Sequence, residues 1–411
     1  MNRKNGALAR GNFVCIVACA IILRPTAARA QDIAISGATV YTSPDDAPLR
    51  EGTVIVRSGK IFAVGAAIAV PKEIPQVACD GCAVFAGFWN NHVHFTGPQW
   101  TAAAQQSGTK LTAALQEMLT HSGFTTVVDC ASDPENTIAL RRRVEDGEVL
   151  GPRIYTAGAG LYPPHAIPYY LSDLPTEVRE HLPQPETAQQ AIEVVHHNQA
   201  LGTDIVKLFT GSYLTPEKIV PMPLDVAKAA VQAGHRDHQL VFAHPSNLAG
   251  VRIAIESGVD VLAHVPDAVT GIDDTVLRDM LAHHIAMVPT LKLFSHDNNI
   301  SRLRQIVAQY HTMGGRLMFG TDTGFLRDYS VEEEYRQLGL AGLSFREVLA
   351  MLTTAPAEEF RVAAHAGRIR VGNDGDLTVI VADPSAGKME DFARVLYTIR
   401  AGRVIFARDH R

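Results

Sequence analysis

Residues 83–95, which read AVFAGFWNNHVHF, combine a continuous apolar run with two histidines at its carboxyl end. A run without polar alternation is typical of a parallel strand that is buried on both faces. His92 and His94 are two residues apart, and side chains at that spacing lie on the same face of a strand. We therefore expect a buried strand over 83–95 that presents two imidazoles at its end.

Similar apolar runs follow along the chain, at 125–131, 153–158, 204–210, 240–245, 259–265, 286–294 and 317–323. Amphipathic helical patterns separate most of them, for example at 186–201 and 224–233. Eight strands that alternate with helices match the size of a (β/α)8 barrel. The sequence therefore predicts the α/β class, with a TIM-type barrel over residues 85–365.

Both ends of the chain read as short strands separated by proline and glycine turns. We expect them to pair in one small β-sandwich-like domain, formed by residues 31–84 and 366–411, that flanks the barrel. Within it, Cys79-Asp80-Gly81-Cys82 reads as a tight turn between two short strands. Whether Cys79 and Cys82 form a disulfide stays open, and Cys130 is expected to be buried and inert.

Residues 1–30 have the order of a secretory signal peptide: basic residues, the apolar run 13–23, then Ala28-Arg29-Ala30. This apolar run is too short to span a bilayer as a helix. We expect cleavage after Ala30 and a periplasmic or secreted location. Cleavage before Cys19, as in a lipoprotein, is the alternative.

The charge balance of the chain bears on its partners. Loss of residues 1–30 would remove five basic residues and no acid, which changes the formal charge from −6 to −11. An acidic surface disfavours nucleic acid and anionic membranes as partners. We expect a small-molecule substrate, no nucleic acid and no membrane association after signal cleavage, and we leave a homo-oligomer open.

Three later strands also end on a side chain that can bind a metal, namely His244, His264 and Asp322. In TIM barrels the carboxyl ends of the strands carry the active site. A single histidine of this kind could equally be a hydrogen-bonded core residue. Four histidines and one aspartate, counting His92 and His94, are hard to obtain by accident, and we predict that they form a metal site.

Lys207 lies in the middle of the apolar strand 204–210. Lysine is rarely buried without a partner, and a buried lysine loses its proton readily. The neutral amine can add carbon dioxide to become a carbamate, whose two oxygens can bridge two metals. The alternative is that Lys207 pairs with Asp204 or reaches solvent at the end of the strand.

These six residues occur in the order and strand placement of the amidohydrolase superfamily, and the chain resembles its imidazolonepropionase/prolidase-like branch. The resemblance extends to Gly123-Phe124-Thr125-Thr126, Gly151-Pro152-Arg153 and Gly375-Asp376-Leu377. It implies two divalent metal ions, with zinc as the default and manganese or cobalt as alternatives. One ion would be bound by His92, His94 and Asp322, the other by His244 and His264, and carbamylated Lys207 would bridge them.

The resemblance also implies a reaction. A metal-bridged hydroxide would cleave the amide (peptide-like) bond of a small substrate such as a dipeptide or an N-acyl amino acid. Asp322 would be the catalytic residue that transfers the proton, and Lys207 favours the two-metal peptidase-like members over one-metal deaminases. An esterase, lactonase or phosphotriesterase would use the same site, and a non-catalytic metal-binding protein is the third interpretation.

Loops after the barrel strands would supply the substrate contacts. The candidates are Tyr162, His165, Tyr169, Tyr170 and Tyr213, together with Trp100 and Ser212. Such an aromatic set suits an apolar acyl or aryl group. Packing among the loops is the alternative for each of these residues.

Overall fold

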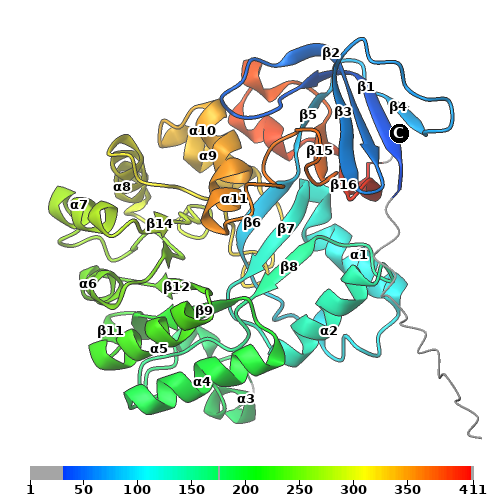
Figure 1. Cartoon of the computed structure of the whole chain (residues 1–411). Coiled ribbons are helices and arrows are strands. Elements are labelled where there is room, and N and C mark those ends of the chain that lie inside the picture. Colours follow the sequence, from blue (N-terminus) through cyan, green and yellow to red (C-terminus); the bar gives the residue numbers. More distant parts are fainter. Residues whose placement is uncertain (1–30, 175, 409–411) are drawn as a thin grey trace, which may run out of the picture.

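The structure is a computed structural model that describes residues 31–174 and 176–408. The predicted signal peptide, residues 1–30, lies outside the described residues. Helices surround the strands of the middle part of the chain, and a sheet from the chain ends lies to one side (Figure 1). None of the helices in the described ranges is long and apolar enough to cross a membrane.

The helices are α1 (Gly108–Met118), α2 (Pro134–Glu145), α3 (Thr176–Glu180), α4 (Ala188–Leu201), α5 (Leu224–Arg236), α6 (Leu248–Ser257), α7 (Asp274–Ala282), α8 (Ile300–Thr312), α9 (Glu332–Leu340), α10 (Phe345–Leu352) and α11 (Thr354–Glu359). Several begin at a side chain that caps the first turn. At α4, the Thr187 side chain accepts from the Gln190 backbone while the Gln190 side chain accepts from the Thr187 backbone. This reciprocal capping fixes where the helix begins.

Strands from both chain ends pair in one eight-stranded sheet, in the order β17-β16-β15-β5-β1-β2-β3, with β4 paired to β1. Its strands are β1 (Ile33–Val40), β2 (Leu49–Arg57), β3 (Lys60–Ala66), β4 (Gln76–Ala78), β5 (Ala83–Ala86), β15 (Leu377–Ile380), β16 (Val395–Arg400) and β17 (Arg403–Ala407). Cys79 and Cys82 form a disulfide in the turn between β4 and β5. Strand pairing alone does not define domain boundaries. We therefore keep as predictions the sandwich-like form of the small domain and the domain boundaries 31–84, 85–365 and 366–411.

The strand predicted over 83–95 is two strands in two sheets. β5 belongs to the sheet of the chain ends, whereas β6 (Phe88–Val93) begins the parallel strands of the middle part. The chain changes sheet at Gly87, where a Cβ atom would lie 2.1 Å from Oγ1 of Thr125. A glycine allows this close approach because it has no side chain.

The middle of the chain forms two parallel groups, β6-β7-β8 and β9-β12-β13-β14. These strands are β7 (Phe124–Asp129), β8 (Arg153–Thr156), β9 (Ile205–Phe209), β12 (Leu240–His244), β13 (Val261–Leu262) and β14 (Ala286–Met287). Among the described residues, the predicted last strand, 317–323, makes only isolated bridges: Leu317 pairs with Met287, and Thr323 pairs with Val93 and Leu326. The fold is therefore α/β and resembles a TIM barrel as predicted, but the described residues do not form a continuous closed sheet.

An antiparallel hairpin of β10 (Gly211–Thr215) and β11 (Lys218–Pro221) follows β9 and is not apparent from the sequence pattern. The Ser212 hydroxyl donates to the carbonyl of Ala166 at 2.6 Å, and the Ser246 hydroxyl donates to the carbonyl of Gly211 at 3.0 Å. These two bonds fix the hairpin to the loops that follow β8 and β12.

Thr378 of β15 connects the sheet of the chain ends to the barrel-like part. Its buried hydroxyl donates to the carbonyl of Gly123 at 2.7 Å and accepts from the backbone N–H of Phe88 at 3.1 Å. Both partners flank strands of the middle part, so this one hydroxyl satisfies two backbone groups at the junction.

Thr378→Val should lower the free energy of unfolding by about 1–3 kcal/mol, because valine has a similar shape but leaves these buried groups unpaired. Urea unfolding followed by two spectroscopic probes measures the change. Thr270→Val, at an exposed loop position, is the control; we expect a change within about 0.5 kcal/mol for it. Equal effects of the two substitutions would contradict the role of Thr378.

Candidate metal centre and active site

Three of the predicted ligands converge at the carboxyl end of β6. The Asp322 Oδ1 atom lies 3.1 Å from Nε2 of His94 and 3.4 Å from Nε2 of His92. The two Nε2 atoms are 3.2 Å apart, and ligand atoms of all three residues lie within 4.8 Å of one another. Two imidazole nitrogens and one carboxylate oxygen at this spacing can bind one divalent cation.

The other ring nitrogens of the two histidines are oriented by the backbone. Nδ1 of His92 lies 2.6 Å from the carbonyl of Ala263, and Nδ1 of His94 lies 2.7 Å from the carbonyl of Ala131. A carbonyl can only accept, so each Nδ1 carries the proton and each Nε2 directs a lone pair towards Asp322. Histidines that bind metals are oriented in this way.

Asp322 itself fits a cation. Its Oδ1 atom is buried and has no hydrogen-bond partner among the described residues, which is costly for a carboxylate unless a cation is present. Its backbone is left-handed, with a φ of 57°, and its N–H donates to the carbonyl of His92 at 2.9 Å. A strained backbone of this kind is common at functional sites.

The Asp322 carboxylate also acts on the pKa of His94. Burial alone would lower this pKa, but the nearby negative charge of Asp322 raises it. At His92, burial lowers the pKa strongly. A neutral imidazole is the form that binds a metal, so the buried ring of His92 is already in its binding form at neutral pH.

His264 and His244 lie beside this group. The ring of His264 is centred 4.4 Å from that of His92 and 4.5 Å from that of His244. The Thr290 hydroxyl donates to the carbonyl of Pro289, so it accepts from Nδ1 of His264 at 2.7 Å. Nε2 of His264 is therefore free to bind a metal, and burial lowers the pKa of both histidines.

Lys207 is 1% exposed, and its Nζ atom lies 5.4 Å from the centre of the Phe209 ring. Within the described ranges its Nζ atom has no hydrogen bond or ion pair to another side chain or to the backbone. Asp204 instead pairs with Arg141 at 2.5 Å, so both alternatives, pairing with Asp204 and exposure to solvent, are wrong. Burial lowers the pKa of Lys207, which favours the neutral amine that carbamate formation requires.

Three of the predicted substrate residues lie among aromatic or polar partners at the loops. Tyr162 stacks on Phe209 with ring centres 4.3 Å apart. Tyr170 packs against Phe325 with its ring centre at 5.5 Å. The Tyr213 hydroxyl donates to Oδ2 of Asp267 at 2.6 Å.

The other candidates have partners outside the candidate metal centre. The side chain of His165 is 87% exposed, and its Nε2 atom lies 3.3 Å from Glu186. Tyr169 is exposed and touches Tyr170. Trp100 is buried edge-on against Phe95, and the Ser212 hydroxyl bonds to the carbonyl of Ala166, so both side chains have packing or hydrogen-bond partners in the loops.

Two acidic residues near the site are not among the predicted residues. Asp129 ends β7, is completely buried and accepts from the hydroxyls of Ser132 at 2.5 Å and Thr156 at 2.6 Å. Burial raises its pKa, and the charge of His94 opposes this rise. Asp267 follows His264 by three residues. A polar residue just after an apolar strand is the signal that could have identified both.

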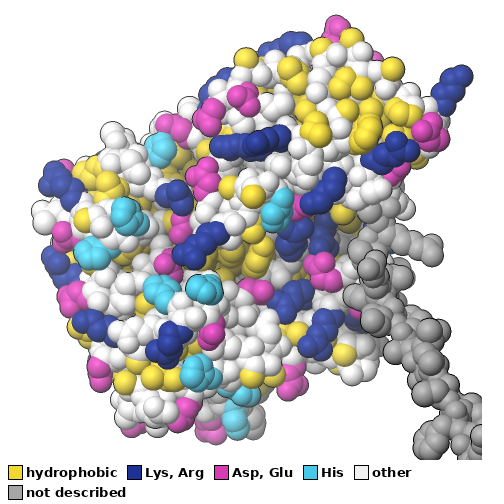
Figure 2. Space-filling model, viewed as in Figure 1, with side chains coloured by type: hydrophobic (Ala, Val, Ile, Leu, Met, Phe, Trp, Pro, Cys, Tyr) yellow, Lys and Arg dark blue, Asp and Glu magenta, His cyan; other side chains and the backbone are white. Residues whose placement is uncertain are grey.

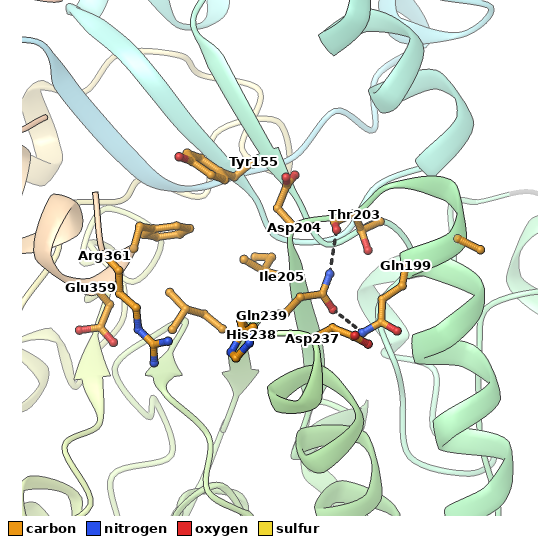
Figure 3. Close-up of a pocket in the computed structure, with 13 residues that line it drawn as sticks. Tyr155, Gln199, Thr203, Asp204, Ile205, Asp237, His238, Gln239, Glu359 and Arg361 are labelled. Carbon is orange, nitrogen blue, oxygen red and sulfur yellow. Dashed lines mark hydrogen bonds between the residues drawn. The ribbon is translucent and has the colours of Figure 1, made fainter. Parts of the chain in front are cut away.

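A cavity of about 650 Å³ lies at the other end of the strands, where β9 and β12 begin. Figure 3 shows its lining, with Gln239 between Thr203 and Gln199. The Gln239 amide donates to the carbonyl of Thr203 at 2.7 Å and accepts from Gln199 at 2.9 Å. None of the six predicted metal-binding residues lines this cavity, so it is separate from the candidate metal centre.

Comparison with known proteins agrees with this geometry. Residues 83–405 match the model of the amidohydrolase family. Ochratoxinase of Aspergillus niger is 22% identical over 398 residues, which cover 83% of this chain and 79% of that protein.

Two solved structures have a similar fold. A Xaa-Pro dipeptidase matches with a TM-score of 0.76 and 18% identity, over 91% of this chain and 99% of that one. A putative prolidase from Bifidobacterium longum matches with a TM-score of 0.74 and 23% identity, over 91% and 94%. The predicted resemblance to prolidase-like amidohydrolases is confirmed. Because the family match covers most of its length, the chain belongs to the amidohydrolase family.

Proposed function

We propose that the chain is a binuclear metal-dependent hydrolase that cleaves the amide bond of a small substrate, such as a dipeptide or an N-acyl amino acid. Membership of the amidohydrolase family supports hydrolysis of carbon–nitrogen bonds. The observation that carries the proposal is the unsatisfied, buried Oδ1 atom of Asp322 between the Nε2 atoms of His92 and His94. We also propose that further strand segments complete a (β/α)8 barrel around this site.

The second part of the site supports two metals rather than one. His264 lies in ring contact with His92, and His244 lies in ring contact with His264. Lys207 is buried with no hydrogen bond or ion pair through Nζ in the described part of the chain. As a carbamate, Lys207 would add an anionic ligand between the two histidine groups. A pair of zinc ions, or manganese or cobalt, would supply Lewis acidity and lower the pKa of a bound water.

The protein groups have distinct roles in this reaction. The Asp322 carboxylate accepts the proton of the attacking water and returns it to the leaving amine. The carbonyls of Ala263 and Ala131 hold His92 and His94 in the required tautomer. Burial of the site excludes bulk water and strengthens these electrostatic interactions.

The location and partners are part of the proposal. We propose export to the periplasm or the medium with a small-molecule substrate. The signal-like order of residues 1–30 supports export, and the expected formal charge of −11 disfavours nucleic acid and anionic membranes. On the face shown in Figure 2, basic, acidic and histidine side chains are interspersed.

A substrate panel tests the proposed reaction. The metal-loaded protein is assayed with dipeptides, N-acyl amino acids, aryl esters, lactones and phosphotriesters at matched concentrations. We expect the highest kcat/KM for an amide. A higher kcat/KM for an ester, lactone or phosphotriester would assign the site to that bond type, and no turnover of any substrate by metal-loaded protein would favour a non-catalytic role.

A further inference from the structure

Tyr213 of β10 and Asp267 form a polar pair between two loops. The Tyr213 hydroxyl donates to Oδ2 of Asp267 at 2.6 Å. The backbone carbonyl of Asp267 accepts from the Asn299 amide at 2.6 Å, which ties it to the loop before α8. Asp267 is thus fixed by two neighbouring loops at the carboxyl ends of the strands.

This pair lies on the same side of the molecule as the metal-binding residues. Tyr170 packs against Phe325, which follows Asp322 by three residues. Burial raises the pKa of Tyr170, and the charges of Tyr162, Asp322 and Asp267 raise it further. Tyr213 follows β9, which holds Lys207, and Asp267 follows His264 by three residues, so the pair lies just beyond the carboxyl ends of strands that carry candidate ligands.

The polarity of the pair is defined by its hydrogen bond. The Tyr213 hydroxyl donates its only proton to the hydrogen bond with Asp267. Its oxygen can therefore only accept a hydrogen bond from a further partner. In the described part of the chain, the Asp267 carboxylate has no Lys, Arg or His nitrogen within ion-pair distance. Burial raises the pKa of Asp267 to about 6, so the group is mainly ionised at neutral pH. The pair presents acceptors and a negative charge, and no donor.

We propose that Tyr213 and Asp267 bind the ammonium group of the substrate, so that the site selects amides with a free amino group over their N-acylated counterparts. An ammonium group donates three hydrogen bonds and compensates the charge of the Asp267 carboxylate, which has no cationic partner among the described residues. A substrate carboxylate or carbonyl at this position would face two acceptors and be repelled. The inference rests on the proposed amide hydrolysis and narrows its substrate from dipeptides or N-acyl amino acids to the former.

The test compares a dipeptide with its N-acetyl form on the metal-loaded full chain. We expect the kcat/KM of the wild type to be at least roughly tenfold higher for the free dipeptide than for its N-acetyl form. One hydrogen bond to a charged group contributes a factor of this size. In Asp267→Asn, KM for the free dipeptide should rise by a similar factor while the N-acetyl form is unaffected. Tyr213→Phe should also reduce the preference for the free dipeptide over its N-acetyl form. Asp297→Asn, an exposed neighbour, is the matched control and should keep the preference.

The outcomes separate this inference from the proposed function. Equal turnover of the two forms by the wild type, or a preference for the N-acetyl form, would overturn the inference and leave amide hydrolysis intact. An equal loss of both activities in Asp267→Asn would assign Asp267 a structural role and also overturn it. Turnover of neither form, with metal bound, would contradict both proposals.

Discussion

Asp322→Asn should reduce kcat by roughly 10²–10⁴-fold while the chain stays folded, which is the usual contribution of a positioned proton-transfer group. Asparagine has the shape of aspartate but cannot accept and return a proton at neutral pH. The loss should appear in kcat rather than in KM, because the proton moves only in the chemical step. Steady-state kinetics and circular dichroism of the metal-loaded variant measure the two properties.

The same experiment separates proton transfer from metal binding. Asp322 Oδ1 also lies beside two imidazoles, so the metal content of the variant must be measured at the assay concentration. Asp237→Asn, at an exposed position, is the control and should keep full activity. Full activity of Asp322→Asn with metal bound would remove Asp322 from the mechanism.

Most of the strands could be predicted from the sequence because buried parallel strands are continuous apolar runs. For the same reason the boundary between β5 and β6 at Gly87 could not be predicted, since the residues on both sides of Gly87 are apolar. At the boundary between β5 and β6, Thr125 of the following strand, β7, approaches Gly87 closely. Contacts of this kind cannot be seen from local patterns.

The candidate ligands could be proposed one by one because each of them ends or lies in an apolar strand. The contacts around these side chains could not be predicted. Asp204, a plausible partner of Lys207 in the sequence, is bound by Arg141, 63 residues away. The bond between Tyr213 and Asp267 joins loops 54 residues apart. Loop residues such as His165, with a left-handed φ of 54°, are placed by turn geometry that the sequence does not specify.

Lys207→Gln should lower the bound metal from about two to about one equivalent, because the variant cannot supply the anionic bridge of a binuclear site. Activity should fall at least roughly 10–100-fold, the range seen when a group that supports a metal is removed. Glutamine keeps most of the side-chain length but cannot form a carbamate. Metal analysis after gel filtration, together with kcat, measures both effects.

Bicarbonate dependence distinguishes a carbamate from a simple loss of packing. Metal-free wild type should regain activity faster with Zn²⁺ and bicarbonate than with Zn²⁺ alone, whereas Lys207→Gln should show no such difference. Lys292 is a matched control, since it is also buried but its Nζ atom donates to the carbonyls of Asp328 at 2.6 Å and Ser330 at 2.5 Å. An amine held by such bonds is not free to react with carbon dioxide, so Lys292→Gln should keep the response to bicarbonate. A wild type that regains full activity equally without bicarbonate in carbon-dioxide-free buffer, or a Lys207→Gln variant that retains two metals, would rule out the carbamate.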